Sequence, residues 1–130
     1  MPEREMTKRI LRAMAHPAMT ILGHPTGRLL LGRVGYSIDY DVIFETAKKH
    51  GVAIELNANP HRLDLDWRVC REAKVKGIRL CINPDAHSVE GLSDVIYGVG
   101  IARKGWLEKR NILNTMSASE MEKFLVARAK

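Results

Sequence analysis

The chain has 130 residues, a formal net charge of +6 and 45% hydrophobic residues, of which few are aromatic. This length favours one domain, and the apolar content excludes a disordered chain. Two cysteines without a Cys-x-x-Cys spacing exclude a zinc finger and a disulfide framework, and the lack of a long apolar run or a leader predicts a cytoplasmic protein and no membrane partner.

Helical and strand patterns alternate along the chain. Apolar repeats at helical spacing, capping residues and terminal glycines predict helices, and short apolar runs bounded by glycine or proline predict strands. The predicted helices cover residues 3–15, 40–49, 65–76, 88–102 and a last segment opened by a capping box at 117–120. The predicted strands cover residues 19–23, 52–56 and 78–82.

Two of these helices carry predictions for individual side chains. Asp39 is expected to cap the helix over 40–49, whose inward-facing residues are expected to be Val42, Ile43 and Ala47. Ser88 is expected to cap a continuous helix over 88–102. Its apolar residues on one side are expected to be Leu92, Val95, Ile96 and Val99.

Strands that alternate with helices imply parallel pairing through right-handed crossovers. Apolar runs without alternation fit a parallel sheet that is covered on at least one face. The predicted fold class is therefore α/β, with about three parallel strands and covering helices. A sheet this small has two open edges, which leaves three alternatives: the chain is part of something larger, it forms a homo-oligomer through the edges, or another segment covers an edge.

Polar residues gather where each predicted strand ends. Because the carboxyl ends of parallel strands lie on one rim, these side chains are expected to be neighbours. They are His24 and Arg28 after the first strand, Glu55, Asn57, Asn59 and Arg62 at the end of the second, and Asn83, Asp85 and His87 after the third.

A metal site is one interpretation of this rim. Imidazole and carboxylate suit zinc, manganese or iron, and an extended Asp-x-His stretch would point Asp85 and His87 to the same side. A bound cation would polarise a phosphoryl oxygen, and Arg28 and Arg62 could hold phosphate oxygens. The alternative is an ordinary set of turns, in which Asn57 bonds to nearby backbone and Glu55 faces solvent.

The segment over residues 103–110 mixes basic side chains with Trp106 in a predicted loop. Such a mixture is compatible with contact to nucleic acid, and equally with a solvated surface.

Several motifs together resemble a known family. "ILGHPTGRLL", "ELNANPHRLDL", "DAHS" and "YGVGIARKGWLEKRNILNT", in this order, resemble the C-terminal part of the PHP (polymerase and histidinol phosphatase) domain, in the version fused to bacterial and archaeal family X DNA polymerases. The resemblance implies a partial PHP-type distorted TIM-like barrel and a site for divalent metal ions, typically zinc or manganese. By position, His24 matches one metal-ligating histidine of the family, and Asp85 and His87 match its Asp-x-His pair.

The same resemblance implies a function for a longer protein. The parent activity would be metal-dependent 3′-5′ exonuclease or phosphoesterase action on DNA 3′ ends in DNA repair. Glu55, Asn57, Arg28 and Arg62 would support the ligands or face phosphate. The family's opening His-x-His motif is absent, so residues 1–130 are expected to be the C-terminal portion of one domain, with the remaining PHP and polymerase domains as partners and little activity alone. The alternatives are a histidinol-phosphatase-type enzyme and a non-enzymatic assembly module.

Overall fold

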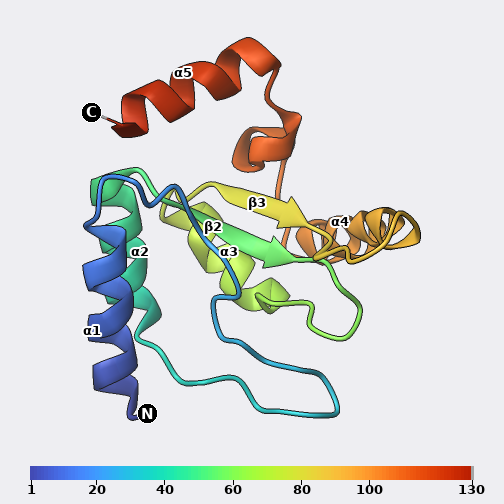
Figure 1. Ribbon diagram of the computed structural model, residues 1–130, viewed down its shortest axis with the longest axis horizontal. Coiled ribbons are helices and arrows are strands. Elements are labelled where there is room, and N and C mark those ends of the chain that lie inside the picture. Colours follow the sequence, from blue (N-terminus) through green and yellow to red (C-terminus); the bar gives the residue numbers. More distant parts are fainter. Residues whose placement is uncertain (130) are drawn as a thin grey trace.

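The computed structural model describes the backbone of residues 1–129 and the side chains of residues 1–128 (Figure 1). Helices and strands alternate as predicted. The elements are α1 (Glu3–Met14), β1 (Ile21–Leu22), α2 (Tyr40–His50), β2 (Ala53–Asn57), α3 (Trp67–Val75), β3 (Leu80–Asn83), η1 (Glu90–Asp94), α4 (Val95–Lys104), η2 (Lys109–Asn111), η3 (Leu113–Thr115) and α5 (Ala118–Ala129). Among the described residues, no helix is both long and apolar enough to cross a membrane.

The three strands form one parallel sheet in the order β1-β2-β3. Ile21 pairs with Ala53, and Ile54 pairs with Leu80, so each crossover places the next strand beside the last. In Figure 1, β2 and β3 point toward α4, while α1 and α2 lie at the opposite end of the sheet and α5 lies apart from them on another side. The predicted α/β class and parallel pairing are confirmed.

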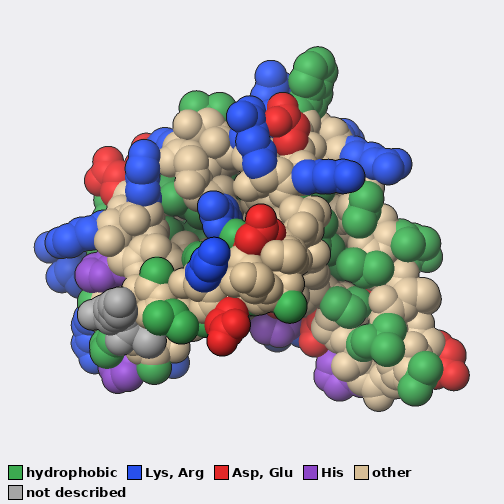
Figure 2. Space-filling model, turned by 90° about the horizontal axis from the view of Figure 1, so that it is seen from above, with side chains coloured by type: hydrophobic (Ala, Val, Ile, Leu, Met, Phe, Trp, Pro, Cys, Tyr) green, Lys and Arg blue, Asp and Glu red, His purple; other side chains and the backbone are tan. Residues whose placement is uncertain are grey.

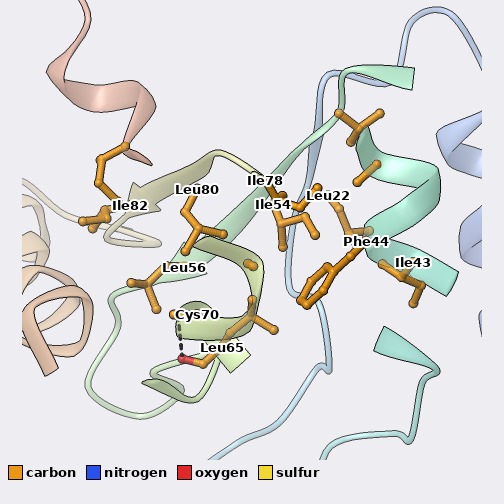
Figure 3. Close-up of a cluster of buried hydrophobic side chains, with 14 of the residues drawn as sticks. Leu22, Ile43, Phe44, Ile54, Leu56, Leu65, Cys70, Ile78, Leu80 and Ile82 are labelled. Atoms are coloured by element: carbon orange, nitrogen blue, oxygen red, sulfur yellow. Dashed lines mark hydrogen bonds between the residues drawn. The ribbon is translucent and has the colours of Figure 1, made fainter. Parts of the chain in front are cut away.

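Both faces of the sheet are covered by apolar side chains. Ile54 and Leu56 of β2 and Leu80 of β3 belong to the main core, together with Phe44 of α2 and Cys70 of α3 (Figure 3). The residues of opposite parity face a second, smaller cluster, formed by Ala53, Cys81 and Leu113 with partly buried residues of α5. Because successive side chains point to opposite faces, covering both faces explains the unbroken apolar runs of the strands.

Local signals fix several helix ends as predicted. The Asp39 carboxylate accepts a hydrogen bond from the Val42 amide, and Gly51 ends α2 with a left-handed φ of 66°. The capping box before α5 is reciprocal: the Ser117 amide donates to Glu120 over 2.7 Å, and the Glu120 amide donates to the Ser117 hydroxyl over 3.2 Å.

The predicted burial of Val42 is wrong. Val42 is exposed, and Ile43, Phe44 and Ala47 form the buried stripe of α2. The aromatic ring of Phe44 faces the core beside Ile43. Val42 precedes Ile43 in the sequence and lies on the other side of it around the helix, outside this buried stripe.

The predicted continuous helix over 88–102 is also wrong. Ser88 accepts a hydrogen bond from the Gly91 amide, but a 3₁₀ turn (η1) precedes α4. Leu92, Ile96 and Val99 are exposed, whereas Gly98 and Ala102 are the buried residues of α4. Val95, the fourth predicted residue, is partly buried and packs against the main core, as does Ile101. Gly98 lets the backbone of the helix come close to Ile82 and Ala58, where a larger side chain would not fit.

Replacing Gly98 by alanine should lower the free energy of unfolding by about 1–3 kcal/mol through overpacking. A Cβ at this position would lie 2.5 Å from Cγ2 of Ile82 and 2.7 Å from Cβ of Ala58. Gly100 is the matched control because it lies on the same helix with nothing within 4 Å of the added Cβ, so Gly100→Ala should stabilise the helix slightly. Urea denaturation of both variants checks this, and equal effects would contradict the packing argument.

A side chain covers part of the outer edge of β3. The Ile82 amide donates to Asn114 Oδ1 over 2.8 Å, and Asn114 Nδ2 donates to the Ile82 carbonyl over 2.8 Å. Leu80 also forms a bridge with Ile112. Of the three alternatives for the open edges, coverage by another segment therefore holds at β3; association through the edges stays a prediction.

Both cysteines are free and buried. Burial raises the pKa of the Cys70 thiol to about 12, with Asp66 adding to the rise, and burial also raises the pKa of Cys81. Both thiols are therefore protonated at neutral pH and serve as packing groups.

Candidate functional site

His24 and Asp85 meet at the carboxyl end of the sheet. His24 lies two residues beyond β1 and Asp85 two residues beyond β3, so the chain segments that carry them leave the same rim. Nε2 of His24 lies 3.9 Å from Oδ2 of Asp85. The imidazole is about half exposed and the carboxylate is mostly covered, so a ligand can reach the pair from solvent. The structure thus brings together two of the side chains predicted to share a site.

Asn57, the last residue of β2, lies between them and is fully buried. Its amide nitrogen donates to Oδ2 of Asp85 over 3.2 Å and lies 3.5 Å from Nδ1 of His24. Its side-chain oxygen accepts from the Asn59 amide over 3.0 Å, which is the contact with nearby backbone that the turn interpretation predicted for Asn57. One buried amide therefore orients both functional side chains and starts the following turn.

Glu55 ties the three strand ends together. It lies on the same face of β2 as Asn57, two residues earlier, and only 8% of it is exposed. One carboxylate oxygen accepts from the His24 backbone amide over 2.7 Å, and the other accepts from Asn83 Nδ2 over 2.9 Å. The alternative that Glu55 faces solvent is wrong; it holds the His24 backbone in place from the middle strand.

Both His24 and Asp85 adopt left-handed backbone conformations, with φ of 45° and 54°. Such values are uncommon outside glycine and gather at functional sites, where the surroundings enforce them. They also correct one premise of the sequence argument, because the Asp-x-His stretch is not extended. Nδ1 of His87 instead lies 2.8 Å from the Asp85 carbonyl. Since a carbonyl only accepts, Nδ1 is the donor in this contact, and Nε2 is the ring nitrogen that does not take part in it.

The two predicted arginines have different roles. Arg62 approaches the cluster, with Nε 3.4 Å from Oδ2 of Asp85. Arg28 donates to the carbonyls of Arg62 and Leu63, and Arg62 donates back to the Arg28 carbonyl over 3.2 Å. Arg28 therefore fastens the loop after β2 to the loop after β1, and only Arg62 places its charge next to the cluster.

Sequence reasoning missed Asp64, which is fully buried and orders the loop after β1. Its carboxylate accepts from the Thr26 amide, the Thr26 hydroxyl and the Gly27 amide over 3.0–3.1 Å. Its backbone pairs with that of Asn57 in both directions, which brings it back to the end of β2. The available signal was an acidic residue between Leu63 and Leu65, where a solvated loop would not be expected.

A pocket of about 660 Å³ lies beside this cluster, between the loop after β1 and the start of α2. Arg28, Tyr36 and Tyr40 line it, but His24 and Asp85 do not. Burial raises the pKa of Tyr36, and it raises that of Tyr40 to about 12, with the Asp64 charge adding to both shifts. Both phenols are protonated at neutral pH, and the Tyr36 hydroxyl donates a hydrogen bond to the His24 carbonyl over 3.0 Å.

His24 and Asp85 supply part of a ligand set for a cation. A nitrogen and an oxygen bonded to one tetrahedral zinc ion lie about 3.3–3.5 Å apart. The 3.9 Å between Nε2 of His24 and Oδ2 of Asp85 is a few tenths of an ångström longer, so a small side-chain shift would let both bind one ion. Within residues 1–129, no three His, Cys, Asp or Glu side chains are grouped closely enough to hold a metal ion. The predicted ligand set of His24, Asp85 and His87 stays a prediction.

Comparisons with known proteins give a consistent result. No family model matches the chain. It is 47% identical over 124 residues to the DNA polymerase/3′-5′ exonuclease PolX of Bacillus subtilis, covering 95% of this chain and 22% of that protein. It is 30% identical to a probable phosphatase of Vibrio parahaemolyticus over 98% of this chain and 52% of that protein, and 31% identical over 62% of this chain to one of Clostridium acetobutylicum.

The chain thus spans about a fifth of the polymerase and half of the Vibrio phosphatase. These matches confirm the resemblance predicted from the motifs: nearly the whole chain is similar to part of a family X DNA polymerase, and it is similar at lower identity to probable phosphatases.

Proposed function

We propose that this chain is the C-terminal portion of a PHP domain and forms part of a distorted barrel whose activity is metal-dependent hydrolysis of DNA phosphodiesters at 3′ ends. The observation that carries the proposal is the 3.9 Å approach of His24 and Asp85 across the rim of the sheet, with the buried amide of Asn57 between them. The polymerase/exonuclease and the probable phosphatases among the relatives support a phosphoesterase, and DNA repair in the cytoplasm is the setting that we propose for it.

His24 and Asp85 would hold a zinc or manganese ion, and His87 would add a third ligand through Nε2. Bound there, the cation would polarise a phosphoryl oxygen and activate a water molecule. Nδ1 of His87 lies within hydrogen-bond distance of the Asp85 carbonyl. A hydrogen bond from this nitrogen to a backbone carbonyl commonly orients metal-binding histidines in proteins. These three residues come from two crossover units, so the ligand set depends on the sheet being formed.

The neighbouring residues keep this arrangement in place. Asn57 orients the Asp85 carboxylate, and Glu55 holds the His24 backbone. Arg62 balances the charge of Asp85 and is placed to attract a phosphate oxygen, while Arg28 fixes the loop from which Arg62 projects. Each of these contacts positions a group before substrate arrives, which is how an active site avoids reorganisation during reaction.

A single cation does not provide the clamp that two metal ions place around a transferring phosphoryl group. We therefore expect the chain alone to hydrolyse DNA slowly or not at all, and the rest of the PHP domain and the polymerase domains to be its partners. The test is a chimaera in which this chain replaces the matching segment of the Bacillus polymerase, assayed with manganese on DNA carrying a labelled 3′ end.

The chimaera should retain exonuclease activity, and His24→Ala within it should reduce the rate at least about 100-fold while polymerisation continues. A folded chimaera that polymerises but lacks exonuclease activity would contradict the proposal. A preference for phosphomonoesters over DNA would favour the second candidate, a small-molecule phosphatase of the histidinol-phosphatase type, which the probable phosphatases among the relatives support.

A further inference from the structure

The turn after α4 exposes a tryptophan at an energetic cost. Trp106 is 70% exposed, so most of its ring forgoes burial in the core. Its φ of 62° is left-handed, which is unfavourable for a bulky residue. The left-handed residue closes the end of α4, because the amides of Trp106 and Leu107 donate to the carbonyls of Arg103 and Ala102 over 3.0 Å. Glycine is the usual residue at such a position, and closing the helix does not need an exposed ring. A binding role for the indole accounts for its exposure.

The turn that presents Trp106 is fixed to α3. Lys74 donates a hydrogen bond to the Trp106 carbonyl, and the Leu107 amide donates to the Ala102 carbonyl over 3.0 Å. A Cβ on Gly105 would lie 2.9 Å from the carbonyl oxygen of Trp67, so the turn passes α3 too closely for another residue. The indole is therefore held on a rigid support, which reduces the entropy lost on binding.

Cationic side chains surround this ring and a second one. The guanidinium carbon of Arg71 lies 5.6 Å from the centre of the Trp106 ring. Lys104 Nζ lies 5.3 Å and the Arg68 guanidinium carbon 5.6 Å from the centre of the Trp67 ring. Cations at these distances are attracted to the ring faces. The tryptophan patch comprises Trp67, Arg68, Arg71, Arg103, Lys104 and Trp106.

The positive charge of the tryptophan patch is only partly neutralised. Arg68 pairs with Asp66 over 2.9 Å. In the part of the chain that the structure describes, Arg71, Arg103 and Lys104 take part in no ion pair. Figure 2 shows a surface on which lysine and arginine side chains are prominent, several of them close together in the upper part of that view. A rigid aromatic platform beside uncompensated cations is the combination that single strands of nucleic acid recognise.

We infer that the tryptophan patch binds a single strand of nucleic acid. Bases stack on the open side of Trp106, and Arg71, Arg103 and Lys104 hold the phosphates. Stacking on an indole is tolerant of sequence because every base has a π face, so the preference is for unpaired strands rather than for a particular sequence. The inference does not rest on the proposed hydrolysis, because binding here needs no metal and none of the residues near His24 and Asp85.

The test is fluorescence anisotropy with a labelled 15-nucleotide oligothymidine, in EDTA so that no metal-dependent step takes part. Trp106→Ala should weaken binding about 5- to 100-fold, and Trp106→Phe, which keeps a ring for stacking, should restore most of it. Arg71→Ala should weaken binding more than Arg12→Ala, which removes one exposed cation on α1 outside the patch. Affinity should fall linearly with salt concentration on logarithmic axes.

Any of three results in these titrations would overturn the inference: no binding to the oligonucleotide, equal affinity of the Trp106→Ala and wild-type proteins, or equal losses for Arg71→Ala and Arg12→Ala. A fourth comes from heparin. Competition with heparin separates stacking from charge alone. If heparin binding drops as much as oligothymidine binding in Trp106→Ala, the indole is not a base platform and the inference fails. Because Trp106 lies outside the core, circular dichroism of the variants should match the wild type.

Discussion

Replacing Asp85 by asparagine should lower the affinity of the chain for zinc or manganese by about 100-fold or more, since even residues that only support metal ligands contribute 10- to 100-fold. The substitution removes the carboxylate charge but keeps the side-chain size. Asparagine also tolerates the left-handed backbone at this position, so the local fold should survive. Isothermal titration calorimetry of the metal-free protein with each cation measures the change.

His61→Ala is the matched control, because His61 is an exposed loop histidine near Arg62 whose side chain makes no contact with the cluster in the described structure. Its metal affinity should equal that of the wild type. His87→Ala should lower the affinity about tenfold if Nε2 is a ligand. Unchanged binding in both Asp85→Asn and His24→Ala would show that the rim holds no cation, and the proposed hydrolysis would lose its chemical basis.

The elements that sequence reasoning placed correctly are those with strong local signals. Asp39 and Gly51 bound α2, and the Ser117–Glu120 capping box opens α5, because each satisfies backbone groups within a few residues. The parallel sheet followed from apolar runs separated by helices. The prediction for α4 was wrong because the pattern of large apolar residues shows which face of a helix is hydrophobic, not which face packs on the sheet. Gly98 determines the packed face, since only glycine allows the backbone to come this close to Ile82 and Ala58.

The candidate site was predictable in outline for a similar reason. Parallel strands bring their carboxyl ends to one rim, so His24 and Asp85 could be expected to meet, and they do. The left-handed backbone at both residues and the turn of His87 toward the Asp85 carbonyl depend on long-range contacts that no local pattern encodes. The two roles of Asn57, in the turn and toward Asp85, likewise become separable only when the three strand ends are in place.

Replacing Asp64 by alanine should lower the free energy of unfolding by about 3–4 kcal/mol, a large part of the stability of a small domain. The substitution leaves the Thr26 amide, the Thr26 hydroxyl and the Gly27 amide without their shared acceptor. Asp66→Ala is the matched control: it removes an aspartate that caps α3 at the surface, for which about 1 kcal/mol is expected. Urea denaturation at neutral pH compares the two variants.

Asp64→Ala should also affect the rim indirectly. Asp64 orders the segment that follows His24, so its loss should also weaken metal binding, although Asp64 lies outside the predicted ligand set. Thr26→Val removes one of the three donors and should lower stability and metal affinity less than Asp64→Ala does. In the Asp64→Ala background, Thr26→Val should cause almost no further loss, because the two residues act through one hydrogen-bonded unit. Additive effects, or an Asp64→Ala variant no less stable than Asp66→Ala, would mean that the loop is held by the Arg28 contacts with the carbonyls of Arg62 and Leu63 instead.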